Sequence, residues 1–376
     1  MDFKDIVGQD FLKDYFQKTI AKNRIPNTQM FVGKEGTGTL AMAWAFAGEL
    51  LCGNNENCRH KVKKLIHPDL HFIFPSITRD HIRKPSSEDF INEWREFLSV
   101  HPYQSLFDWH RHLNVGNKQG EIRVTDAENI AKKVSVKPYE ASYKVFIIWM
   151  AEKMNLNTAN KLLKILEEPP EDTKFILITR KTDDILDTIL SRCQIHHFNA
   201  IPIEKIKEKI KEIYSFEEDK ALKIAHQSNG NWNKALELAK ENNSDDEFQK
   251  LFINWVRIAF SAKNNKQAIR KLIEWSEDLS TKGREFQKRF LNFALQTFRQ
   301  ALLINYQNND LAYFDFSKNG FDLNKLAPFV HSKNIQGIYE SLTQATYHIE
   351  RNANPKISFL DLSIKLTRLI HQKEVV

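Results

Sequence analysis

The feature that most constrains the fold is an alternation of short apolar runs with amphipathic stretches, which stops near residue 200. The strand-like runs are TQMFVG, DLHFIFP, KVFIIWM, KFILIT and QIHHF. Runs of this kind, separated by helical patterns, are typical of a parallel sheet covered by helices. Beyond Pro202, apolar residues recur at spacings of three and four, as they do along one face of a helix. The sequence therefore predicts an α/β domain followed by all-helical segments.

These patterns predict three domains: an α/β domain at 1–199, a small helical domain at 200–243 and a larger helical domain at 244–376. The boundary between the helical domains is the polar cluster ENNSDDE at 241–247, because Asn, Ser and Asp favour turns and caps over helix interiors. Residues 76–120 follow the second strand and are longer than a usual loop. We interpret them as an insertion with a helix in SSEDFINEWREFLSV.

Composition narrows the classes of function. Hydrophobic residues make up 41% and charged residues 27%, and no apolar run approaches the roughly 18 residues of a membrane span. The segment MDFKDIVGQDF lacks the basic-then-apolar pattern of a secretory signal. The three cysteines are too few for a disulfide framework, so we expect a cytoplasmic protein without a membrane partner. A net charge of +7 permits a nucleic-acid partner without requiring one.

The stretch MFVGKEGTGTL has the glycine spacing of a phosphate-binding loop without its chemistry. Gly33 and Gly38 match the GxxxxGK[ST] pattern, and Gly36 lies between them. Thr39 and Leu40 occupy the places of the Lys that reaches the phosphates and of the Ser or Thr that holds Mg²⁺. The glycines could still form an anion-binding nest or could simply permit a tight turn. We expect no bound cofactor.

A second catalytic element of such proteins is also missing. Enzymes that hydrolyse nucleotides with such a phosphate-binding loop use acids at the end of a buried strand to place the metal ion and the attacking water. Here KVFIIWMAEK places Trp149 and Met150 at that end. Glu152 follows, and we interpret it as a solvated residue in the next turn. ATP hydrolysis by this chain's own site is therefore not expected.

Two further segments resemble the AAA+ clamp-loader family of DNA replication. NTANKLLKILEEPPEDTKFILIT followed by ILSRCQIHHF is similar to the family's aNaLLKtLEEPP and SRC motifs, and FKDIVGQDFLKDYFQKTIAKNRIPNTQMFVG resembles its N-terminal segment. The resemblance covers residues 1 to about 240. It implies an AAA+ αβα domain, a helical lid and a C-terminal collar domain that packs subunits into a ring-like assembly.

The resemblance also implies roles for single residues. Arg192 matches the arginine finger, which acts in trans on ATP and Mg²⁺ held by a neighbouring ATPase subunit. Ser191 would cap or orient the turn, and Cys193 would be a small buried residue. Asn233 stands where active members carry an Arg that senses nucleotide. The implied partners are the ATPase and clamp-opening subunits, and through the assembly the sliding clamp and primer-template DNA.

Two remaining motifs have a structural interpretation. Many relatives bind zinc with four cysteines, but here only Cys52 and Cys58 occur, with His60 and His67 in a Cx5CxHx6H order. This spacing lacks the close ligand pairs of zinc modules, so zinc is not expected, and we interpret the set as a core cysteine, a surface cysteine and two solvated histidines. The adjacent acids of LEEPP at 167–168 are interpreted as the last turn of a helix that the two prolines end.

Three hypotheses follow from the sequence. The first is a non-hydrolysing scaffold that supplies Arg192 to a neighbour's ATP. The second is an ATPase, or a nucleotide-binding switch, that tolerates an unusual loop. The third, suggested by a pI near 9.0, is a free-standing DNA-binding protein with a salt-sensitive affinity.

Overall fold

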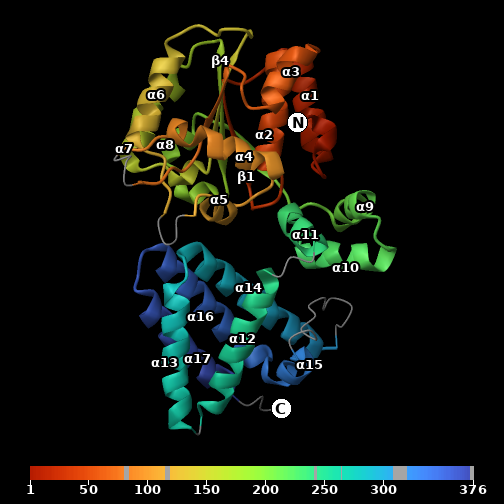
Figure 1. Ribbon diagram of the computed structural model, residues 1–376, viewed down its shortest axis with the longest axis vertical. Coiled ribbons are helices and arrows are strands. Elements are labelled where there is room, and N and C mark those ends of the chain that lie inside the picture. Colours follow the sequence, from red (N-terminus) through yellow and green to blue (C-terminus); the bar gives the residue numbers. More distant parts are fainter. Residues whose placement is uncertain (80–83, 115–118, 241–243, 264, 308–319, 373–376) are drawn as a thin grey trace. The chain divides into compact units, whose positions relative to one another are not determined.

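The computed structural model describes residues 1–79, 84–114, 119–240, 244–263, 265–307 and 320–372. The chain divides into two compact units, Met1–Ala239 and Lys240–Val376, and each is described by itself (Figure 1). The predicted boundary between 1–199 and 200–243 falls inside the first unit and stays a prediction.

The first unit is built on a 5-stranded parallel sheet with the strand order β2-β3-β4-β1-β5. Its strands are β1 (Thr28–Gly33), β2 (Leu70–Ile73), β3 (Lys144–Trp149), β4 (Thr173–Thr179) and β5 (Gln194–Phe198). Each of the apolar runs of the sequence overlaps one of these strands, which confirms the predicted α/β fold. Because β1 lies between β4 and β5, the glycine loop that follows it leaves the interior of the sheet.

Helices cover both faces of this sheet (Figure 1). One layer contains α1 (Asp10–Ala21), α2 (Thr39–Cys52) and α3 (Glu56–Lys63), and the other contains α6 (Val124–Val134), α7 (Leu156–Glu167) and α8 (Asp187–Leu190). Successive side chains of β1 point to opposite faces of the sheet. Phe31 packs in one hydrophobic cluster, and Met30 and Val32 pack in the other. This arrangement confirms the αβα architecture that the resemblance implied.

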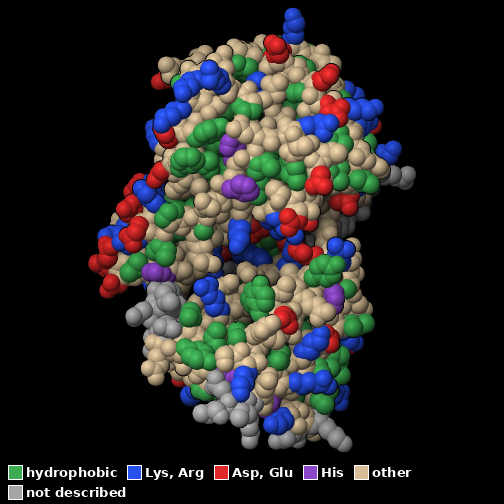
Figure 2. Space-filling model, turned by 180° about the vertical axis from the view of Figure 1, so that it is seen from behind, with side chains coloured by type: hydrophobic (Ala, Val, Ile, Leu, Met, Phe, Trp, Pro, Cys, Tyr) green, Lys and Arg blue, Asp and Glu red, His purple; other side chains and the backbone are tan. Residues whose placement is uncertain are grey.

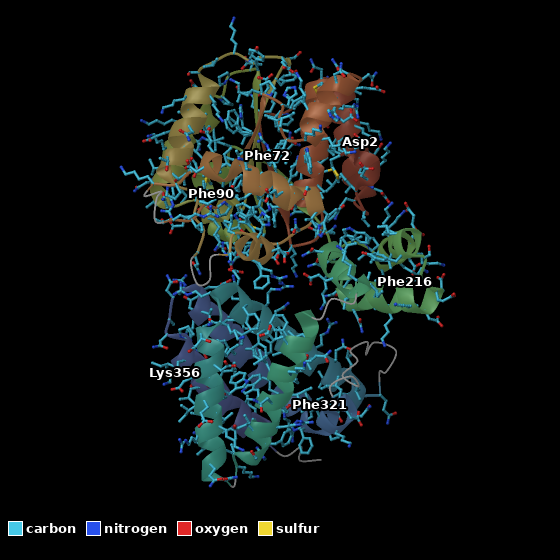
Figure 3. The ribbon with its side chains drawn as sticks, viewed as in Figure 1. Asp2, Phe72, Phe90, Phe216, Phe321 and Lys356 are labelled. Carbon is cyan, nitrogen blue, oxygen red and sulfur yellow. A yellow bond between two sulfur atoms is a disulfide. The ribbon has the colours of Figure 1, made fainter. Side chains whose placement is uncertain are left out.

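The predicted insertion contributes α4 (Ile91–Val100) and α5 (Leu106–His112), and α4 lies within the segment predicted as helical. Its side chains complete the core around the end of β2, where Phe72 and Phe90 are labelled in Figure 3. The ring of Trp94 stacks on that of Phe74, with 4.2 Å between the centroids. The insertion is therefore packed into the α/β core, although 80–83 and 115–118 lie outside the described residues.

Three helices complete the first unit: α9 (Ile203–Tyr214), α10 (Glu218–Ser228) and α11 (Trp232–Ala239). Ile206 and Ile210, one helical turn apart on α9, are both fully buried. The prediction of helices after Pro202 is confirmed. We call α9–α11 the lid.

The second unit is helical and contains α12 (Ser244–Ser261), α13 (Lys266–Thr281), α14 (Arg284–Asn305), α15 (Leu323–Leu326), α16 (Ser332–Glu350) and α17 (Pro355–Leu369). Trp255 and Trp275 stack with 5.1 Å between their rings, and the indole N–H of Trp255 donates to Ser363 Oγ at 2.8 Å. Figure 3 labels Phe321 and Lys356 in this unit. Part of the predicted boundary cluster, at 241–243, lies outside the described residues. Within the described parts of both units, no helix is long and apolar enough to cross a membrane.

Candidate functional site

The glycine loop keeps the backbone of a phosphate-binding turn. Gly36 and Gly38 have φ angles of 73° and 95°, which glycine adopts without the steric cost that other residues meet. Within the loop, the Thr37 hydroxyl donates to the carbonyl oxygen of Lys34 at 2.7 Å. Leu40, where a Mg²⁺ ligand would stand, is only 3% exposed and belongs to the hydrophobic core. The turn therefore keeps its shape, while the metal-binding position has become a packing position.

The lid lies directly on this loop. The backbone N–H of Trp232 donates to the carbonyl oxygen of Gly36 at 3.0 Å. A Cβ atom at Gly36 would lie 1.8 Å from Asn231 Oδ1 and 3.1 Å from Asn231 Cα, so only glycine permits this approach. Asn231 Oδ1 cannot move away without loss, because it accepts the N–H of Lys234 in the first turn of α11. The loop thus contacts the protein's own lid at the place where a nucleotide would approach.

The insertion covers the loop from a second direction. Tyr103 is 5% exposed, and a Cβ atom at Gly38 would lie 3.1 Å from its ring. Its hydroxyl oxygen accepts the backbone N–H of Val7 at 2.9 Å, which ties the N-terminal segment to the insertion. Burial raises the pKa of the Tyr103 phenol well above its usual value, so the side chain is neutral at physiological pH.

Asn233 has a structural partner instead of a nucleotide. Its side-chain Nδ2 donates to Asp108 Oδ2 at 2.9 Å, and the residue is 6% exposed. Asp108 lies in the first turn of α5, where it also accepts the backbone N–H of Ser105. This bond links the lid to the insertion at the position where the sequence had indicated only a lost sensor arginine.

The space between the loop and the ends of β3 and β4 is small. The cavity has a volume of about 20 Å³, roughly enough for one or two water molecules. It is lined mainly by the glycine loop, the segment 102–104, Trp149, Met150 and 178–180. This volume is much smaller than a triphosphate, and Tyr103 is among the residues that line the cavity.

An ion pair occupies the polar side of this cavity. Arg180 Nε donates to Glu152 Oε1 at 2.8 Å, and Arg180 Nη1 lies 3.7 Å from Glu35 Oε1. The interpretation of Glu152 as a solvated residue was wrong, because its side chain is only 2% exposed. The first turn after β3 carries it inward, where the Arg180 charge compensates its burial. The acids near the loop are therefore paired with Arg180.

Trp149 and Met150 lie where the sequence lacks the catalytic acids, and both are buried. The centroid of the Trp149 ring lies 5.1 Å from that of Trp94 and 6.1 Å from that of Phe97 on α4. The insertion therefore packs against apolar groups at the end of β3. This packing explains why carboxylates, which need hydration or a metal, are absent from these two positions.

Arg192 lies apart from the cavity and is not among the residues that line it. It follows α8, and its side chain is 32% exposed. Its Nη2 donates to Glu167 Oε1 at 2.6 Å and its Nη1 to the carbonyl oxygen of Thr188 at 2.6 Å. The Ser191 hydroxyl donates to the same carbonyl at 3.2 Å, in keeping with a turn-orienting role. Cys193 is partly buried, and burial raises the pKa of its thiol to about 12. The roles of these residues stay predictions.

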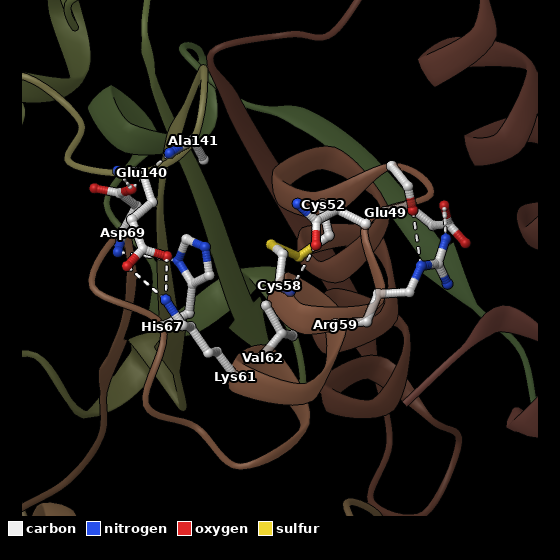
Figure 4. The surroundings of a disulfide bond; sticks show 12 residues. Glu49, Cys52, Cys58, Arg59, Lys61, Val62, His67, Asp69, Glu140 and Ala141 are labelled. Carbon is white, nitrogen blue, oxygen red and sulfur yellow. Dashed lines mark hydrogen bonds and ion pairs between the residues drawn. A yellow bond between two sulfur atoms is a disulfide. The ribbon is translucent and has the colours of Figure 1, made fainter.

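Cys52 and Cys58 form a disulfide bond, with 5.3 Å between their Cα atoms (Figure 4). The three cysteines argued only against a disulfide framework, and the interpretation of Cys52 and Cys58 as a core and a surface cysteine did not foresee this single bond. It forms because the turn after α2 brings α3 back along it and places the two residues side by side. His67 is also not solvated: it is 3% exposed, and burial lowers the pKa of its imidazole. Its Nδ1 accepts the N–H of Asp69 at 3.2 Å.

The same three residues test whether zinc fits. The sulfur atoms of Cys52 and Cys58 and a nitrogen of His67 lie within 4.8 Å of one another. Structural zinc takes four ligands, with cysteines bound as thiolates. Within the described residues this cluster offers three donors, and two of them are joined in a disulfide. The residues therefore do not fit zinc in the disulfide form, and the expectation of no zinc stays a prediction.

Sequence reasoning missed the residues that cover the loop. Tyr103 lies 65 positions beyond Gly38 in a segment without a motif, and nothing in its neighbours indicated where it would point. Asn231 lies two positions before Asn233, and the resemblance assigned a role only at Asn233. Only Arg180 could have been placed near the loop from the sequence, because it directly follows β4 and the ends of parallel strands lie at the same sheet edge.

The fold is an αβα domain whose degenerate glycine loop is contacted by the lid and the insertion, and comparison with known proteins assigns the family. Residues 8–202, more than half of the chain, match the family model described as DNA polymerase III, delta subunit. The chain therefore belongs to this family, which confirms the resemblance found in the sequence.

Individual relatives agree with this assignment. The chain is 30% identical over 199 residues to DNA polymerase III subunit delta' of Bacillus subtilis, covering 51% of this chain and 48% of that protein. It is 25% identical over 244 residues to DNA polymerase III subunit tau of Escherichia coli, covering 64% and 32%. The alignments thus span less than half the length of these relatives. A gamma subunit-related protein of Thermotoga maritima aligns over 95% of this chain and 99% of its own, with 16% identity and a TM-score of 0.40.

Replacing Gly36 by Ala should destabilise the protein by about 2 kcal/mol, as measured by urea unfolding. A non-glycine residue with positive φ costs about 1 kcal/mol, and displacing Asn231 from its cap costs about as much again. Gly320→Ala is the matched control, because Gly320 also has a positive φ of 61° but a Cβ atom there would meet nothing within 4 Å. Equal losses for the two variants would contradict the close contact between lid and loop.

Alkylation of the denatured chain should add one label without reductant and three after reduction, as measured by intact mass. The reason is that Cys193 is the free thiol while Cys52 and Cys58 are bonded to each other. Three labels without reductant, together with one zinc per chain by elemental analysis, would show a thiolate metal site in place of the disulfide.

Proposed function

We propose that this chain is a non-hydrolysing, delta-prime-type subunit of the DNA polymerase III clamp loader, acting in DNA replication in the cytoplasm. It is then an accessory subunit of the DNA-directed DNA polymerase III holoenzyme, whose nucleotidyl transfer belongs to other subunits. Family membership and the similarity to delta' and tau sequences support this proposal. The observation that carries it is that the protein's own lid and insertion cover the loop, while Arg192 lies outside that cavity.

In this proposal the chemistry takes place on a neighbour. The chain joins the gamma/tau ATPase subunits and the delta subunit, and it meets the sliding clamp and primer-template DNA through the assembly. ATP and Mg²⁺ are held by the adjacent ATPase subunit, and Arg192 offers positive charge to the γ-phosphate. Arginine suits this task because its planar, permanently charged group matches phosphate oxygens. Fingers supplied in trans raise the rate by about 10³ to 10⁵ in related phosphoryl transfers.

A second candidate is a chain that still binds or hydrolyses ATP itself. The left-handed conformations of Gly36 and Gly38 favour it, because they preserve the turn that nests an anion. The 20 Å³ cavity and the Arg180–Glu152 pair oppose it. The DNA-binding hypothesis has weaker support, since acidic and basic side chains are interspersed on the face of the first unit that Figure 2 shows.

The purified chain should show no magnesium-dependent ATP turnover above background. Restoring the loop residues with Thr39→Lys and Leu40→Thr should not create turnover, because Trp149 and Met150 leave the metal ion and the water without ligands. Phosphate release from both proteins measures this directly. Turnover by the unmodified chain, at a rate typical of ATPases, would favour the second candidate.

Arg192→Ala should slow DNA-stimulated ATP hydrolysis by the reconstituted assembly without preventing assembly. The affected site should lose about 10³-fold or more in rate, so the total falls by the share that this site contributes. Steady-state turnover measures the loss, and gel filtration checks that the subunits still associate. Arg192→Lys should restore little, because a point charge does not replace the planar group. Unchanged turnover in both variants would remove Arg192 from the mechanism.

A further inference from the structure

The two glutamates of the LEEPP motif, Glu167 and Glu168, have different surroundings in the structure. Glu167 is the last residue of α7, and its Oε1 accepts a hydrogen bond from Arg192 Nη2 at 2.6 Å. Glu168 is exposed and has no ion pair or hydrogen bond within the described part of the chain. The two residues therefore differ in contact although they share a charge and a turn. The interpretation of the whole motif as a helix end missed this difference.

Glu167 is well fixed relative to Arg192. The helix α7 ends at Glu167 because Pro169 and Pro170 cannot continue it. The helix α7 also packs against α8, which leads into the turn that carries Arg192. Two elements of defined length thus set the positions of the carboxylate and the guanidinium, although the residues are 25 positions apart.

The contacts of Arg192 leave part of its guanidinium available. An arginine side chain has five N–H donors. Three of them are directed at the chain itself: one at Glu167, one at the Thr188 carbonyl and one, at 3.4 Å, at the Ser191 hydroxyl. Among the described residues, the other two donors have no partner, and the side chain is 32% exposed. The group is therefore oriented but not fully engaged.

We propose that Glu167 is a positioning residue, which holds the Arg192 guanidinium so that its two remaining donors can meet a phosphate on the neighbouring subunit. This inference rests on the proposed function of Arg192. A flexible arginine loses rotamer freedom when it docks on a phosphate, whereas one that is already held loses less. The Glu167 carboxylate does not cancel the attraction of Arg192 for a phosphate. Solvent screens this partly exposed pair, and a γ-phosphate carries more negative charge than a carboxylate.

The test uses the reconstituted assembly and compares single substitutions by steady-state kinetics. Glu167→Ala should lower kcat for DNA-stimulated ATP hydrolysis about two- to five-fold, the loss expected for one partly exposed ion pair. The KM for ATP should stay unchanged, because the finger acts on the transition state of ATP bound elsewhere. Glu167→Gln should have a kcat between those of Glu167→Ala and the unmodified protein, since its amide oxygen still accepts a hydrogen bond from Arg192. Glu168→Ala is the matched control and should match the unmodified protein.

A double variant separates positioning from a structural effect. If Glu167 acts through Arg192, then Arg192→Ala combined with Glu167→Ala should be as slow as Arg192→Ala alone. A further fall in the double variant would show that Glu167 acts by another route and would overturn the inference. A rise in kcat for Glu167→Ala would also overturn it, because Glu167 would then restrain the arginine.

The outcomes also distinguish this inference from the proposed function. If Arg192→Ala slows hydrolysis but Glu167→Ala matches the unmodified protein, the inference alone fails. If Arg192→Ala leaves hydrolysis unchanged, the proposed function fails and the inference fails with it. Gel filtration of each assembly shows that a loss of rate does not come from a loss of subunits.

Discussion

The contact between the lid and the glycine loop determines how the first unit can work. The Trp232 N–H donates to the Gly36 carbonyl, and Asn231 approaches so closely that a side chain at Gly36 would displace it. In an ATPase, the glycines of such a loop let the backbone surround phosphates. Here the same conformational freedom lets a helix from the same chain close over the loop. The loop is retained because the fold still needs its shape.

Once the loop is covered, the catalytic positions around it become free to serve packing. Trp149 at the end of β3 contacts Trp94 of the insertion, and Leu40 at the start of α2 belongs to the core. Beside the loop, Arg180 pairs with the buried Glu152 and lies 3.7 Å from Glu35. Replacing Leu40 by a metal-binding Ser or Thr, or Trp149 by an acid, would bury a polar group without a partner, which is unfavourable. Leu40 and Trp149 therefore pack into the core at positions where an ATPase of this kind would carry a metal ligand or an acid.

Local patterns in the sequence predicted the elements well and the contacts poorly. The strands β1 to β5 were predicted because each corresponds to a short apolar run between amphipathic stretches. Tyr103 over the loop and Glu167 on Arg192 could not be predicted, because each contact joins segments that are far apart in the chain and depends on how helices pack. The disulfide was missed for a similar reason: a count of cysteines indicates the compartment but does not show which residues a turn brings together.

The most direct measurement is an experimental structure of the assembly reconstituted with a non-hydrolysable ATP analogue. We expect the Arg192 guanidinium to lie within hydrogen-bond reach, about 2.8 Å, of the γ-phosphate on the adjacent ATPase subunit. Tyr103 and the lid should still cover this chain's own loop. A nucleotide bound in that loop, or an Arg192 side chain directed away from the neighbouring site, would contradict the account.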